Sequence, residues 1–166
     1  MSELGAQADQ DCENAHLGRL LLQALRRVQA NAVAKLHACG HPDIRAGHLP
    51  VFGYIDDAGT RITDLAARAG MTRQMMGRLV RELEDLGYVA THSDPGDQRA
   101  VIVTLTAQGT RFGVDGEAVK ARLEHEYAEL LGPGEPARLR RSLLRLANMG
   151  TEPEPDAVDA VEPGAM

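Results

Sequence analysis

Residues 60–109 decide the fold, and they read TRITDLAARAGMTRQMMGRLVRELEDLGYVATHSDPGDQRAVIVTLTAQG. Thr63 is a suitable cap for a short helix that ends in a turn at Gly70. Thr72 is a suitable cap for a longer helix that runs to Leu86 before the next glycine ends it. Two helices joined by a tight turn with glycine are typical of a helix-turn-helix.

A β-hairpin follows directly. Tyr88 to His92 reads as one strand, and the β-branched run Val101 to Leu105 reads as its partner. Residues 93–98 are dense in turn formers, which predicts a long tip between the two strands. The fold class predicted is mainly α with a small β-hairpin wing, that is, a winged helix-turn-helix.

Long amphipathic helices are predicted on both sides of this lobe. Apolar residues fall at helical spacing from Asn14, a suitable N-cap, to Ala38, and a shorter helix is expected over 45–56. Two more helices are expected over 107–131, capped by Thr106, and over 136–149. Their apolar stripes exceed what a small winged helix can cover, so we expect the N- and C-terminal helices to dimerise with a second copy.

The charge of the chain is unevenly distributed. Its formal net charge is −6, but residues 17–149 carry 18 basic against 15 acidic residues. Residues 1–13 and 150–166 are polar, acidic segments that we expect to be disordered tails, leaving 14–149 as a single domain. No apolar run approaches the length of a membrane span, and two cysteines are too few for a disulfide framework, which favours the cytoplasm.

The predicted second helix carries residue types suited to reading DNA. The start of the helix presents backbone N–H groups that can bind a phosphate. Among the side chains, arginine can pair with guanine, glutamine can pair with adenine, and methionine can contact a thymine methyl group. The residues predicted to contact the major groove and its flanking phosphates are Thr72, Arg73, Gln74, Met75 and Arg78. On the hairpin, Arg99 is placed to enter a minor groove. Asp97 is expected to orient Arg99 or to pair with an arginine of the recognition helix.

Residues 60–109 resemble the multiple antibiotic resistance regulator (MarR) family of bacterial transcription factors. The segments that carry the resemblance are Ile62-Thr63-Asp64-Leu65-Ala66, Met71 to Gln74, Leu83 to Val89 and, most specifically, Asp94-Pro95-Gly96-Asp97-Gln98-Arg99-Ala100 followed by Val103-Thr104-Leu105-Thr106 and Gly109. The resemblance implies a homodimeric regulator, expected to repress adjacent genes, that binds a pseudopalindromic operator on double-stranded DNA and is released by a small-molecule effector. It divides the chain into dimerisation helices (14–44 and 107–149) and a DNA-binding lobe (45–106).

In relatives, effectors bind between the dimer helices and the DNA-binding lobe, and Arg19, His48 and Tyr54 are polar residues suited to line such a pocket. Three alternatives stay open. His37, Cys39 and His41 resemble a metal cluster, although a helix would not bring all three together. Cys12 resembles a peroxide-sensing thiol, but its acidic neighbours disfavour reactivity. The fold could also serve as a dimerisation or protein-interaction module. No motif of an enzyme is found, and we expect no catalytic residue, cofactor or metal.

Overall fold

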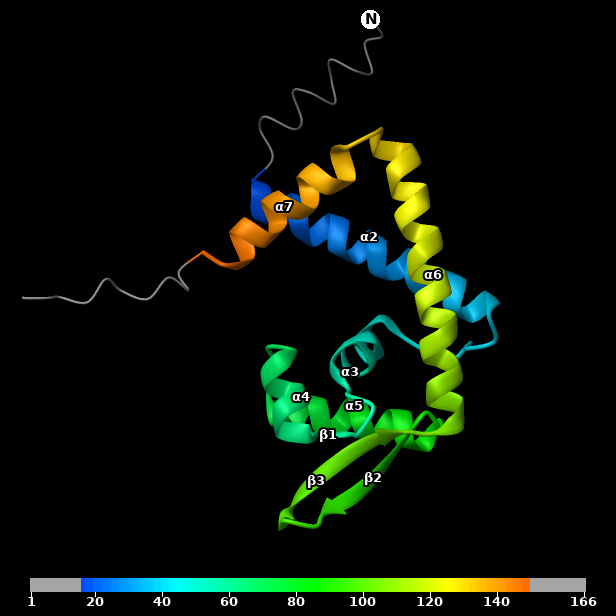
Figure 1. The fold of residues 1–166 in the computed structure, drawn as a ribbon, viewed down its shortest axis with the longest axis vertical. Helices are drawn as coiled ribbons and strands as arrows, with labels where there is room; N and C mark the ends of the chain where they lie inside the picture. Colours follow the sequence, from blue (N-terminus) through cyan, green and yellow to red (C-terminus); the bar gives the residue numbers. More distant parts are fainter. Residues whose placement is uncertain (1–15, 150–166) are drawn as a thin grey trace, which may run out of the picture. The chain divides into compact units, whose positions relative to one another are not determined.

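The computed structural model describes residues 16–149 (Figure 1). Its elements in chain order are α2 (Leu17–Ala38), the 3-10 helix η1 (Ala46–His48), α3 (Leu49–Tyr54), β1 (Thr60–Arg61), α4 (Ile62–Arg68), α5 (Arg73–Asp85), β2 (Val89–Asp94), β3 (Asp97–Leu105), α6 (Ala107–Leu131) and α7 (Glu135–Ala147). Helices α4 and α5 are followed by the β2–β3 hairpin, which projects beyond them (Figure 1). The predicted winged helix-turn-helix is therefore confirmed.

The wing belongs to a three-stranded antiparallel sheet in the order β1-β3-β2. The short strand β1 pairs Thr60 with Val103, and this pairing fixes the backbone that enters α4. The helix therefore begins at Ile62 with Arg61 as its N-cap, so the prediction that Thr63 caps it is wrong. Sequence analysis missed β1 because two residues carry no recognisable strand pattern.

The hairpin tip is shorter than predicted. The strands extend until Asp94 pairs with Asp97, which leaves Pro95 and Gly96 between them, with a register shift at the end of β2. The prediction of a long tip over 93–98 is therefore wrong. Turn-forming residues can stand at strand ends where a side chain accepts the hydrogen bond of a backbone N–H. Here the carboxylate of Asp94 accepts the Gly96 N–H at 2.8 Å.

The remaining helix boundaries agree with the predictions in some places and differ in others. The turn before α5 contains Gly70 in the left-handed region, at φ +62°. Thr106 caps α6, since its Oγ1 accepts the Gly109 N–H at 3.1 Å. The segment predicted as one helix over 45–56 divides into η1 and α3, with a proline in the first turn of α3. The first helix begins after His16, and Asn14 lies outside the described residues, as do both predicted tails.

The core of the lobe lies beneath the sheet and between its helices. Its fully buried side chains include Leu65 of α4, Met76 and Leu83 of α5, and Val103 of β3. An aromatic group, Phe52, Tyr88 and Phe112, joins α3 and the start of α6 to this core.

The chain divides into two compact units between Leu123 and Glu124, inside α6. In the first unit, the apolar side chains of α2 are largely exposed, from Leu17 at 55% to Val28 at 40%. In the second unit, α7 has no buried residue. The single domain predicted for 14–149 stays a prediction. In the described residues, no helix is long and apolar enough to cross a bilayer.

Candidate nucleic-acid interface

Helix α5 presents the residues predicted to read DNA. Its N-cap is Thr72 as predicted, because the threonine Oγ1 accepts the Met75 N–H at 3.2 Å. One side of α5 is buried in the lobe through Met76, Leu79, Val80 and Leu83. The other side is exposed through Thr72, Arg73, Gln74, Met75, Arg78 and Arg81. The structure thus brings the five predicted major-groove residues together on one accessible surface, which we call the reading face.

The tip of the wing is tied to β1 by an ion pair that sequence analysis missed. Asp94 is buried, and its Oδ2 accepts from Nε of Arg61 at 2.6 Å and from Nη2 at 2.5 Å. The backbone N–H of Gly96 foremost, and then Arg61, lower the pKa of Asp94 below its ordinary value. The same pair raises the pKa of Arg61. The wing is therefore fixed to the helix-turn-helix by an ionised carboxylate.

The predicted wing residue Arg99 is exposed on β3. The carboxylate of Asp97 accepts the backbone N–H of Arg99 at 3.0 Å. Asp97 therefore orients the backbone at the start of β3, whereas the ion pair of the wing belongs to Asp94.

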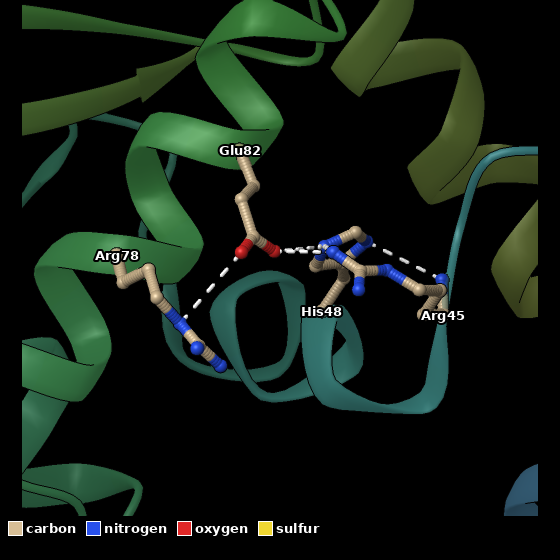
Figure 2. Close-up of polar contacts among 4 residues, drawn as sticks. All are labelled: Arg45, His48, Arg78 and Glu82. Carbon is tan, nitrogen blue, oxygen red and sulfur yellow. Dashed lines mark hydrogen bonds and ion pairs between the residues drawn. The ribbon is translucent and has the colours of Figure 1, made fainter.

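A polar cluster lies at the C-terminal half of α5, centred on the Glu82 carboxylate (Figure 2). Its Oε2 accepts from Arg45 and lies 3.1 Å from Nε2 of His48, while its Oε1 lies 3.7 Å from Nε of Arg78. The hydrogen bond with His48 foremost, together with the charges of Arg45 and Arg78, lowers the pKa of Glu82. We call these four residues the Glu82 cluster.

The three residues suggested for an effector pocket are not brought into contact. His48 is 1% exposed and is part of the Glu82 cluster, Tyr54 is 41% exposed at the end of α3, and Arg19 is exposed on α2. A shallow depression beside the cluster has a different lining, made of Pro42, Asp43, Arg45, Glu82, Asp85 and Leu86. The assignment of Arg19, His48 and Tyr54 to an effector stays a prediction.

The residues that resemble a metal cluster have separate partners. Nε2 of His37 lies 2.8 Å from the Ile44 carbonyl, whereas His41 contacts the Tyr88 hydroxyl and the carboxylate of Asp115. Cys39 is an exposed free thiol at the end of α2. Between residues 16 and 149, no three His, Cys, Asp or Glu side chains are grouped to hold a metal ion. Cys12 lies outside the described residues.

Sequence reasoning missed the contacts that Arg45, Arg61, Glu82 and Asp94 make around α5 and the wing. The spacing of Arg78 and Glu82 is one signal that was available, because residues four apart are neighbours on a helix. The other contacts join residues 33 to 37 positions apart, and no local pattern indicates them.

Comparison with known proteins finds similarity to transcriptional regulators. A model of the MarR family matches residues 43–100. HTH-type transcriptional repressors of Mycobacterium tuberculosis and Mycobacterium bovis are 30% identical over 90 residues, which are 54% of this chain and 65% of each relative. The match thus spans less than two thirds of the length of these relatives.

Solved structures share the fold. A MarR transcriptional regulator from Methanosarcina mazei has a TM-score of 0.70 at 20% identity, covering 81% of this chain and 96% of its own. A cysteine-to-serine mutant of MarR from Escherichia coli, complexed with operator DNA, has a TM-score of 0.69 at 24% identity, covering 78% and 92%. A Bordetella bronchiseptica protein whose DNA binding is regulated by 6-hydroxynicotinic acid has a TM-score of 0.65 at 21% identity, covering 79% and 98%.

Proposed function

We propose that this chain, whose residues 43–100 match a model of the MarR family, is a sequence-specific DNA-binding transcriptional regulator. The observation that carries the proposal is the reading face of α5, which exposes Arg73, Gln74 and Arg78 at a capped helix start. Exposed arginine and glutamine side chains at the start of such a helix can pair with guanine and adenine in a major groove. No enzymatic activity, cofactor or metal is part of the proposal.

The wing adds a second contact. Arg99 is exposed on a hairpin whose tip is held to β1 by the Arg61–Asp94 ion pair, which limits how far this part of the wing can move. A narrow minor groove attracts such a guanidinium through its negative potential. Asp97 contributes through the backbone of the wing.

The active form proposed is a homodimer. Helix α2 exposes Leu17, Leu21 and Leu25, and α7 exposes Leu139 and Leu143, all at 37% or more. Apolar stripes of this kind are normally covered, and a second copy covers them symmetrically while placing two reading faces on a pseudopalindromic site. Residues 14–44 and 107–149 are proposed as dimerisation helices, with 45–106 as the DNA-binding lobe.

The biological role proposed is repression of adjacent genes in the cytoplasm, relieved by a small-molecule effector. The curated relatives are transcriptional repressors by name, and DNA binding in one structural neighbour is regulated by a small molecule. Arg19, His48 and Tyr54 remain the proposed polar residues for the effector.

The test is a salt series with duplex DNA from upstream of the protein's own coding sequence and a scrambled duplex of equal length. Gln74→Ala should cost about 1–3 kcal/mol on the cognate duplex alone, because it removes a base contact. Arg99→Ala should weaken both duplexes and reduce the salt slope by about one counterion per subunit, because its contact is electrostatic. A wild-type protein that binds both duplexes equally would contradict the proposal.

A further inference from the structure

We propose that Glu82 is a positioning residue for base reading, which holds Arg78 so that its two terminal nitrogens meet one guanine in each half-site. This inference rests on the proposed function. It follows from the way the Glu82 carboxylate divides its two oxygens between a buried anchor and the reading face (Figure 2).

The anchor is His48, whose side chain is almost fully buried. Its Nδ1 accepts the backbone N–H of Arg45 at 3.3 Å, so the proton of the neutral ring is on Nε2. That proton is donated to Oε2 of Glu82 at 3.1 Å. Because the imidazole cannot move without losing its own backbone contact, Oε2 is held in a fixed position.

Arg45 strengthens this anchor from the surface. Its guanidinium also donates to Oε2, although its side chain is 66% exposed. The carboxylate thus receives two donors on the same oxygen, from the segment that precedes α3. Its second oxygen is left to face the preceding turn of α5.

Oε1 faces Nε of Arg78, one turn earlier on the same helix, at 3.7 Å. The side chain of Arg78 is 71% exposed, so little else restrains it. A contact at Nε leaves both terminal nitrogens of the guanidinium unused. Those two nitrogens form the fork that pairs with O6 and N7 of guanine.

The chemistry requires a carboxylate rather than any polar group. Both oxygens of ionised glutamate accept hydrogen bonds, whereas glutamine accepts through one atom and donates through the other. In Glu82→Gln, the buried His48 donor takes the single carbonyl oxygen. The amide nitrogen then faces Arg78, and because both groups are hydrogen-bond donors, the restraint on Arg78 is lost.

The experiment measures discrimination at individual guanines. Each guanine in a footprinted upstream duplex is replaced by 7-deazaguanine, which lacks the N7 acceptor, and binding is measured by fluorescence anisotropy. For the wild-type protein, one position per half-site should show a loss of about tenfold or more. Both Arg78→Ala and Glu82→Gln should remove the penalty at that position, since the first removes the guanidinium fork and the second removes the restraint that orients it.

Asp85→Asn is the matched control. It removes the same charge from the exposed side of the same helix, outside the Glu82 cluster. It should raise affinity for scrambled DNA about as much as Glu82→Gln does, because both remove a negative charge near phosphates. It should retain the full penalty at the guanine, which separates orientation from charge.

The outcomes distinguish this inference from the proposed function. If Glu82→Gln retains the wild-type penalty, or if Arg78→Ala does, the inference is overturned while sequence-specific binding stands. If the wild-type protein prefers no upstream duplex over scrambled DNA, the proposed function itself fails. Glu82→Asp decides the question if Glu82→Gln does not fold: it keeps the carboxylate but is one methylene shorter, so it cannot contact His48 and Arg78 together and should also reduce the penalty.

Discussion

Replacing Gly109 by alanine tests how the start of α6 packs against the wing. Gly109 is buried in the first turn of α6, and its N–H is donated to Oγ1 of the capping Thr106. A Cβ at this position would lie 2.1 Å from the carbonyl oxygen of Tyr88 and 3.1 Å from a methyl carbon of Leu105. The nearest atom belongs to the backbone, so a rotamer change cannot relieve the clash.

The expected cost follows from this geometry. Overpacking of a buried site costs about 1–3 kcal/mol, because the helix or the segment that enters β2 must move. For a chain of this length, that corresponds to a melting temperature lowered by roughly 2–12 °C. Tyr88 directly precedes β2, so the same shift should also reduce DNA affinity through the wing.

Gly113→Ala is the matched control in the same helix. A Cβ at Gly113 meets nothing within 4 Å, and helix propensity then favours alanine by up to about 1 kcal/mol. Thermal unfolding followed by circular dichroism, at one fixed protein concentration, compares the two variants with the wild type. A Gly109→Ala variant that melts at or above the wild-type temperature would refute the close approach of α6 to Tyr88.

Three further predictions concern the cap, the wing and the dimer. Thr72→Ala should lower the free energy of unfolding by about 1 kcal/mol, measured by urea titration, because it removes the N-cap of α5; an unchanged midpoint would contradict the cap. Asp94→Asn should lower the free energy of unfolding at pH 7. The difference from wild type should shrink as the pH falls below the ordinary carboxyl pKa of 3.8, because a carboxylate with a lowered pKa contributes stability only while it is ionised. A difference that does not depend on pH would argue against the Arg61 pair. Leu21→Asp combined with Leu25→Asp should convert a dimer to a monomer in sedimentation at micromolar concentration, whereas a wild-type monomer would exclude the proposed interface.

The helix-turn-helix was predictable because its signals are local. Gly70 can adopt the left-handed turn, Thr72 can cap the next helix, and the apolar spacing of α5 marks its buried side. Each signal acts within about four residues, which is the range over which propensity and capping operate. For the same reason, the sequence alone places the five predicted residues on the exposed side of α5, while their contact with DNA stays a prediction.

The errors occurred where distant residues override local preference. Thr63 is a good capping residue, but the pairing of Thr60 with Val103 sets the start of α4 two residues earlier. The wing tip reads as a loop, but Asp94 satisfies the Gly96 N–H and pairs with Arg61, which lets the strands continue. The pairing of Thr60 with Val103 and the Arg61–Asp94 pair each cross more than 30 positions of the sequence, so no local pattern reveals them.

The same principle changes how the charge of the lobe is counted. Basic residues outnumber acidic ones in 17–149, which suggests a surplus of cations for DNA. Yet Arg61 and Arg68 hold β1 and α4 through Asp94 and Asp56, and Arg45 holds Glu82. Cations engaged in this way stabilise the lobe and release fewer counterions when DNA binds. The salt slope should therefore report the exposed arginines of the reading face and wing rather than the total number of basic residues.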